Sequence, residues 1–113
     1  RGLVNGVIAQ VAAALRHISP TNLAAYIGPH ICPSCYEISP DLANEISQKF
    51  PEVIAQSRWG TPSIDMRSSI IRQLQIEEIE PNDLSHCTYE DENLFSYRRD
   101  QKTGRNAGIV WFE

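Results

Sequence analysis

The 113-residue sequence has no long apolar run, no excess of positive charge and few cysteines. No run approaches the roughly 18 apolar residues that a membrane-spanning helix needs, so none is expected. Lys and Arg number 10 against 14 Asp and Glu, a net charge of −4, which argues against binding to nucleic acid or to an anionic membrane. Three cysteines are an odd number and too few for a disulfide scaffold, which favours a reducing, cytoplasmic setting.

A complete catalytic motif is also absent from the sequence. It contains no H-E-x-x-H, no phosphate-binding Gly-rich loop and no recognisable Ser, His and Asp arrangement. It opens with Arg1 and Gly2 directly before an apolar helical pattern, so we expect it to be the C-terminal part of a longer protein. With 42% hydrophobic and 21% charged residues, it has the composition of one folded domain.

Apolar residues at helical spacing predict three helices. The first covers residues 3–18, the second follows Ser39 and Pro40, and the third covers about residues 65–75. Ser39 is a favoured N-cap, and Pro40 fits the first position of a helix. The start of the second helix is therefore well defined.

Short apolar runs predict two strands that are covered on both faces, at residues 23–28 and 107–112. A turn at 101–104 joins the second strand to an extended or irregular segment at 94–99, and residues 81–83 predict a break in regular structure. Because helices and strands interleave, we predict an α+β fold with mixed layers.

Cys32 and Cys35 form a C-P-x-C motif, for which three interpretations remain open. A thioredoxin-like redox site needs a helix that begins at Cys32, but the helix start signals come later. A zinc site could combine Cys32 and Cys35 with His86 and Cys87, although adjacent residues of an extended segment point to opposite faces. We favour the third interpretation, in which the cysteines are small semi-buried residues without chemistry.

Arginines are the best candidates for binding an anionic group. Arg1, Arg98, Arg99 and Arg105 flank turns or aromatic residues, and a guanidinium can bind phosphate or carboxylate through two donors. On the residues alone we favour the alternative for the Arg98 and Arg99 pair, in which they form ion pairs with Asp100 and nearby acids on a solvated turn.

Several motifs follow one another along the chain. They are Leu94 to Asp100, Thr103-Gly104-Arg105, Ile109 to Trp111, Ile27-Gly28-Pro29 with Cys35-Tyr36-Glu37-Ile38, Ile64-Asp65 followed by Leu74, Cys87-Thr88, and Arg1-Gly2. These motifs resemble those of the YfiH-type family, which has been described both as multicopper polyphenol oxidase or laccase-like and as purine nucleoside phosphorylase. The C-terminal motif is similar to the family's F-S-Y-R-R-D…T-G-R…W ending, and Arg1-Gly2 looks like the end of H-A-G-W-R-G.

The resemblance implies a fold shared with the catalytic domain of cytotoxic necrotizing factors. It also implies phosphorolysis of adenosine, inosine and guanosine to base and ribose 1-phosphate, with adenosine deamination as a companion activity. Zinc or copper would be held by two histidines and a cysteine, one of them the histidine of H-A-G-W-R-G. That histidine would precede Arg1 and the other two ligands lie further upstream, so no metal ligand or catalytic residue is assigned to this chain.

We therefore expect residues 1–113 to be the C-terminal part of a single YfiH-like domain and to be inactive alone. Arg1, Arg98, Arg99 and Arg105 are the expected substrate-binding residues, and the expected partners are a purine nucleoside, phosphate and the missing N-terminal part. That part would pack on the apolar face of 3–15 and on strand 107–112.

Two alternatives remain. One is a non-enzymatic module that binds a structural metal through Cys32 and Cys35. The other is a copper-dependent polyphenol oxidase, which is weaker because three histidines are few for a multicopper cluster.

Overall fold

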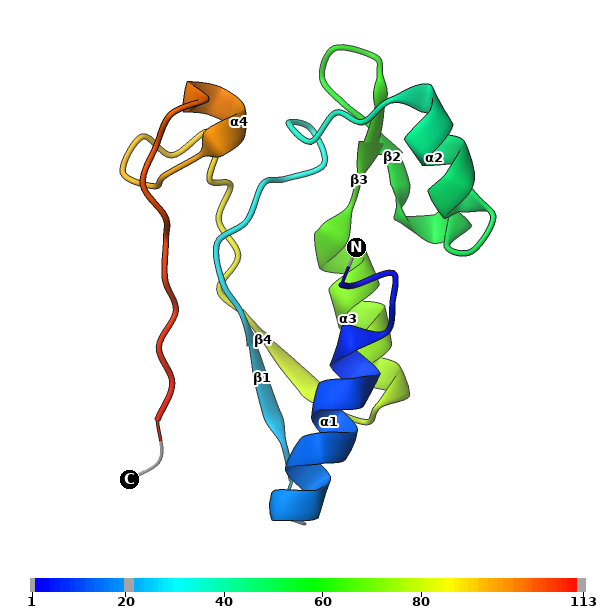
Figure 1. Ribbon diagram of the computed structural model, residues 1–113, viewed down its shortest axis with the longest axis vertical. Helices are drawn as coiled ribbons and strands as arrows, with labels where there is room; N and C mark the ends of the chain where they lie inside the picture. The colour runs from blue at the N-terminus through cyan, green and yellow to red at the C-terminus, as the bar shows by residue number, and fades with distance from the viewer. Residues whose placement is uncertain (1, 20–21, 112–113) are drawn as a thin grey trace.

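The computed structural model describes residues 2–19 and 22–111. Helices and short strands alternate along these residues, which confirms the predicted mixture of α and β structure (Figure 1). The elements are α1 (Val7–Ile18), β1 (Ala24–Ile27), α2 (Pro40–Ser47), the 3-10 helix η1 (Pro51–Val53), β2 (Ile54–Gln56), β3 (Pro62–Ile64), α3 (Met66–Ile76), β4 (Glu80–Asp83) and α4 (Tyr97–Asp100). Among the described residues, no helix is long and apolar enough to cross a membrane.

Strands β1 and β4 form a parallel pair, with Ala24 opposite Glu80 and Ile27 opposite Asp83. Helices α1 and α3 lie next to each other beside this pair (Figure 1). The buried side chains that they enclose form the first hydrophobic cluster, which consists of Ala12, Ile27, Leu74 and Ile79. Because α1 and α3 each present an apolar face to the strands, this cluster is the core of the α1, β1, α3 and β4 unit.

A second hydrophobic cluster lies around the antiparallel pair of β2 and β3. Its buried members come from α2, from η1 and from the segment before α2, and they are Ile38, Ala43, Ile46 and Val53. The Oγ of Ser39 accepts a hydrogen bond from the Leu42 N–H at 3.3 Å, which confirms the predicted N-cap of α2. The structure thus contains two small cores rather than one, and α3 follows β3 directly in the chain.

The predicted helices are confirmed, with one shift of boundary. Helix α1 begins at Val7 and not at residue 3, because residues 2–6 form turns and Gly6 has a positive φ of 75°. Helix α3 begins after Asp65, whose carboxylate accepts a hydrogen bond from the Ser68 N–H at 3.0 Å. The start signals at Ser39 and Pro40 therefore located the beginning of α2 correctly, and the apolar spacing located that of α3 to within about one residue.

Two predictions about the first strand pair are wrong. Residues 81–83 do not break regular structure but belong to β4, where Pro81 is tolerated because, among the described residues, this strand pairs only with β1. Strand β1 is not covered on both faces: Ile27 is buried, whereas Tyr26 is 69% exposed, because α1 and α3 cover one face. An apolar run of this length cannot distinguish one covered face from two.

The C-terminal segment also differs from the prediction. Residues 97–100 form one helical turn, α4, because the Oγ of Ser96 accepts a hydrogen bond from the Arg99 N–H at 3.4 Å. Residues 107–111 form no strand and pair with no strand in the part of the chain that the structure describes, and Val110 is 93% exposed. Phe112, the last residue of the predicted strand, lies outside the described residues.

Candidate functional site

The three cysteine side chains meet at one end of the β1 and β4 pair. Cys32 and Cys35 lie in the loop that follows β1, and Cys87 lies in the loop that follows β4. Because parallel strands end at the same edge of a sheet, both loops leave from the same side. The three sulfur atoms all lie within 4.8 Å of one another, close enough to bind a metal ion together.

Backbone hydrogen bonds hold these two loops side by side beyond the strands. The N–H of His30 donates to the His86 carbonyl at 2.9 Å, and the N–H of Thr88 donates to the His30 carbonyl at 3.1 Å. His30 and Cys87 form an isolated parallel bridge as a result. The cysteines are thus positioned by an extension of the β1 and β4 pairing.

The protonation of the thiols depends on their surroundings. Burial, followed by the hydrogen bond with the Cys32 side chain, raises the pKa of Cys35 to about 12. Burial and the side chain of Cys87 likewise raise the pKa of Cys32. Burial also acts to raise the pKa of Cys87, but hydrogen bonds to its sulfur outweigh this effect and lower that pKa overall. The first of these hydrogen bonds comes from the Cys32 N–H, whose nitrogen lies 3.3 Å from the Sγ of Cys87.

These pKa shifts do not fit a thioredoxin-like site. Such a site needs a Cys32 thiolate stabilised by a helix N-terminus, but the pKa of Cys32 is raised and residues 33–35 form a turn. Helix α2 begins only at Pro40, as the sequence indicated. The expected semi-burial of the cysteines is confirmed, with Cys35 only 3% exposed.

Arg58 and Glu90 complete the surroundings of the cysteine cluster. The Arg58 N–H donates to the Ser34 carbonyl at 2.9 Å, and its Nη2 donates to the sulfur of Cys35 at 2.9 Å. Arg58 also forms an ion pair with Glu90, which raises the pKa of the guanidinium. The Sγ of Cys35 lies 3.8 Å from the Oε1 of Glu90. Sequence reasoning missed both residues, because Arg58 reaches the cluster from the β2–β3 turn and nothing local marks it.

His86 does not join the cysteines in a zinc site. Its Nε2 lies 3.1 Å from the Oδ2 of Asp91, and its side chain is largely exposed. The group of His, Cys, Asp and Glu side chains close enough to hold an ion contains Cys32, Cys35 and Cys87, and among the described residues it does not extend to His86. The prediction that His86 and Cys87 do not readily reach one ion is therefore confirmed for the described residues.

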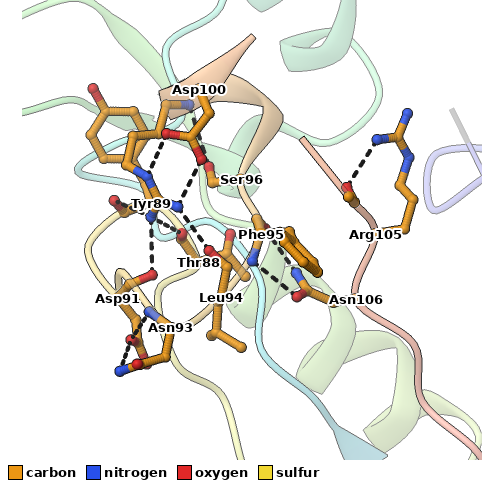
Figure 2. Close-up of polar contacts among 12 residues, drawn as sticks. Thr88, Tyr89, Asp91, Asn93, Leu94, Phe95, Ser96, Asp100, Arg105 and Asn106 are labelled. Atoms are coloured by element: carbon orange, nitrogen blue, oxygen red, sulfur yellow. Dashed lines mark hydrogen bonds and ion pairs between the residues drawn. The ribbon is translucent and has the colours of Figure 1, made fainter. Parts of the chain in front are cut away.

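Arg99 is bound by its own loop. Its guanidinium forms an ion pair with Asp100 through Nε at 2.9 Å and Nη2 at 2.8 Å, as the alternative interpretation of these arginines predicted. It also donates to four backbone carbonyls: those of Thr88 at 3.0 Å, Tyr89 at 3.3 Å, Asp91 at 2.9 Å and Leu94 at 2.8 Å. Figure 2 shows these four residues on one side of Asp100. These contacts use its donors to hold the loop over residues 88–94.

Arg98 and Arg105 are exposed and less engaged. The Nη1 of Arg98 donates to the Glu37 carbonyl at 2.6 Å, and its guanidinium lies 4.9 Å from the centre of the Tyr36 ring. Arg105 donates through Nη1 to the carbonyls of its neighbours Thr103 and Gly104. Arg1, the fourth predicted substrate-binding residue, lies outside the described residues.

A reciprocal pair of hydrogen bonds joins the Arg105 segment to the turn before α4. The N–H of Phe95 donates to the Oδ1 of Asn106 at 3.0 Å, and the Nδ2 of Asn106 donates to the Phe95 carbonyl at 2.8 Å (Figure 2). A Cβ on Gly104 would lie only 2.9 Å from the Phe95 ring, which explains a glycine at this position. Sequence reasoning did not single out Asn106.

The whole chain, residues 1–113, matches the family described as multi-copper polyphenol oxidoreductase laccase. It is 35% identical to a purine nucleoside phosphorylase of Streptomyces coelicolor over 99% of the chain and 48% of that relative. It is 36% identical to a purine nucleoside phosphorylase of Mycobacterium tuberculosis over 95% of the chain and 41% of the relative. It is also 30% identical to the purine nucleoside phosphorylase YfiH of Escherichia coli, over 98% and 47% respectively.

The chain spans about half the length of these relatives. No solved structure matches the chain.

Proposed function

Because the chain belongs to the multi-copper polyphenol oxidoreductase laccase family, which includes YfiH, we propose that the protein that carries it is a purine nucleoside phosphorylase. The observation that carries this proposal is the name shared by relatives from several bacteria, which match nearly all of the chain at 30 to 36% identity. The proposed reaction converts adenosine, inosine or guanosine and phosphate into the free base and ribose 1-phosphate. Adenosine deamination is the proposed companion activity.

We propose that residues 1–113 form the C-terminal part of one YfiH-like domain, with the fold of the cytotoxic necrotizing factor catalytic domain, and that they are inactive alone. An exposed apolar face supports this proposal: Val11 of α1 is 50% exposed, and a groove with a volume of about 240 Å³ lies between α1, β1 and α3. The remaining part of the domain would cover this face. The three free cysteines are compatible with the cytoplasmic location that we propose.

The zinc or copper site that the resemblance implies does not fit the described residues. It requires two imidazoles and one thiolate, whereas the cysteine cluster offers three sulfurs and no histidine. The ring of His30 contacts the Gly28 carbonyl, and that of His86 pairs with Asp91. No step of the reaction is therefore derived through that metal from this chain.

We propose that Arg1, Arg98 and Arg105 bind the phosphate or the nucleoside. The exposure of Arg98 and Arg105 supports this role, as does the capacity of a guanidinium to bind phosphate through two donors. Arg1 is proposed from its position in the H-A-G-W-R-G match. For Arg99 we propose a positioning role, because its donors already bind Asp100 and the backbone of residues 88–94.

Steady-state kinetics of the full-length protein test these assignments. The variants R1A, R98A and R105A should raise the KM for phosphate or inosine, or lower kcat, while thermal stability stays close to wild type. R72A is a matched control, because Arg72 is an exposed arginine that pairs with Glu52 on another part of the surface. If all three variants match R72A in KM and kcat, these arginines do not bind substrate.

The description of the family favours a second candidate function, copper-dependent oxidation of polyphenols. Multicopper chemistry needs several histidines, and the chain contributes only three. Oxygen consumption with a catechol substrate, measured on the copper-loaded full-length protein, separates the two functions. Turnover of catechol without turnover of inosine would favour the oxidase.

A further inference from the structure

The cysteine cluster has the composition of a structural zinc site. Zinc in proteins takes four ligands in tetrahedral geometry, with sulfur at about 2.3 Å, so the sulfurs of such a site lie about 3.8 Å apart. The Sγ atoms of Cys32, Cys35 and Cys87 all lie within 4.8 Å of one another. Small side-chain rotations that bring the two most separated sulfurs about 1 Å closer together would therefore allow all three to bind one ion.

Glu90 is placed to supply the fourth ligand. In a tetrahedral site with one carboxylate oxygen, sulfur and oxygen lie about 3.6 Å apart. The Oε1 of Glu90 lies 3.8 Å from the Sγ of Cys35. Glu90 lies outside the compact group of three sulfurs, so its half-exposed side chain must turn towards Cys32 and Cys87 to share one ion with them. Three sulfurs and one carboxylate oxygen suit Zn²⁺, which accepts both kinds of donor, better than Cu(I), which prefers sulfur alone.

Hydrogen-bond donors point at two of the three sulfurs and would support them as thiolates once a cation binds. The N–H of Cys32 donates to the sulfur of Cys87 at 3.3 Å, and the Nη2 of Arg58 donates to that of Cys35 at 2.9 Å. Zn²⁺ with three thiolates and one carboxylate carries a net charge of −2, and the guanidinium of Arg58 offsets part of it. Such outer hydrogen bonds typically orient metal ligands and strengthen metal binding.

We propose that Cys32, Cys35, Cys87 and Glu90 bind one structural Zn²⁺ ion, with Arg58 as the positioning residue. The ion joins the loop after β1 to the loop after β4, and through Arg58 it connects to the β2–β3 turn. Strand β1 contributes Ile27 to the first hydrophobic cluster, and Ile54 of β2 and Ile64 of β3 pack against the second. The site therefore links segments that adjoin the two clusters. The inference does not depend on the proposed function.

The zinc content of the full-length protein tests the proposal. The protein is expressed with added zinc, dialysed against metal-free buffer and measured by mass spectrometry of the metal. C35S and C87S should each contain one zinc ion per chain fewer than wild type, whereas the control S34A, which alters an exposed neighbour of Cys35, should match wild type. Equal zinc in wild type and in folded C35S and C87S would overturn the proposal.

Cysteine alkylation of the wild-type protein tests the zinc site without relying on a variant that folds. Zinc alone should slow alkylation of all three cysteines by iodoacetamide at least about tenfold relative to chelator-treated protein, because the metal-bound sulfurs are shielded. Equal alkylation with and without zinc would contradict the site, as would a disulfide between two of these cysteines in freshly purified protein.

Variants of the two remaining residues separate their roles. R58M should weaken zinc affinity by about 10 to 100-fold without changing the zinc stoichiometry. E90Q should also weaken zinc binding, and in the cobalt-substituted protein it should alter the visible bands while the thiolate-to-cobalt band remains. Unchanged affinity in E90Q would overturn Glu90 as the fourth ligand, and binding of Cu(I) in place of Zn²⁺ would overturn the assignment of the metal.

Discussion

The Nη2 of Arg99 donates a hydrogen bond to the backbone carbonyl of Leu94 at 2.8 Å, across the turn that leads into α4. The same guanidinium reaches the carbonyls of Thr88 and Asp91, so one side chain holds both ends of the loop at 88–94. A guanidinium that donates hydrogen bonds to several carbonyls in this way stabilises the conformation of the loop. These contacts support the positioning role that we propose for Arg99.

Replacing Arg99 with lysine is expected to destabilise the protein. Lysine keeps the charge but cannot reproduce the planar set of donors, so several carbonyls would lose their partner. The midpoint of urea denaturation should fall in R99K. R105K changes an exposed arginine whose hydrogen bonds within the described residues go to its own neighbours, and its midpoint should stay close to wild type. Equal midpoints for the two variants would contradict the positioning role of Arg99.

Gly104 is expected to resist substitution for a steric reason. An added Cβ would lie 2.9 Å from the Phe95 ring, so this half-exposed ring must rotate away, at a cost of about 0.5 to 1.5 kcal/mol. The control is G108A, because a Cβ at Gly108 would meet no atom within 4 Å, and its effect should stay within about 0.5 kcal/mol. Urea denaturation compares the two variants, and the second substitution F95A should remove much of the G104A penalty. A G104A effect no larger than that of G108A would rule out this steric explanation.

Leu74 tests the first hydrophobic cluster. It is buried between α1 and β1, and L74A should lower the free energy of unfolding by about 2 to 5 kcal/mol through lost burial and a cavity. L42A on α2 is the control, because Leu42 is 40% exposed and its truncation removes less buried surface. Chemical denaturation of both variants checks this, and comparable losses would mean that Leu74 does not belong to the core.

The ion pair of Arg67 and Asp83 predicts a pH dependence. Hydrogen bonds from Ser85, followed by those from Arg67, lower the pKa of Asp83 to about 2. Because this pKa lies below that of an unfolded aspartate, about 3.9, the ionised carboxylate stabilises the folded state at neutral pH. The stabilisation should remain full above about pH 5 and decline as the pH falls towards 2.

The matched variant is D83N, which cannot ionise. The difference in denaturation midpoint between wild type and D83N should be constant between about pH 5 and 8 and shrink below pH 4. A difference that grows as the pH falls would show that the carboxylate is not the source of the stabilisation.

Local signals in the sequence predicted the elements that local contacts define. Ser39, Pro40 and Asp65 mark helix starts because the capping interactions lie within a few residues. Pro81 was misread as a break because its tolerance depends on which strand pairs with β4, a long-range property. The apolar run at 107–111 resembles a strand, but no strand among the described residues pairs with it.

The candidate metal site likewise depends on long-range contacts that local sequence signals do not reveal. The C-P-x-C spacing of Cys32 and Cys35 was visible, but Cys87 joins them only because β1 and β4 are parallel neighbours. Arg58 arrives from a third segment, and no local pattern distinguishes it from other exposed arginines. The weakness of His86 as a ligand could be foreseen, since it follows from the alternation of side chains in extended backbone.

The most direct test of the central claim is product identification with the full-length protein. Inosine is incubated with and without phosphate, and the products are separated by chromatography. The account predicts hypoxanthine and ribose 1-phosphate in equal amounts, with neither formed when phosphate is omitted. Free ribose that forms independently of phosphate, or no reaction with any of the three purine nucleosides, would contradict the assignment as a phosphorylase.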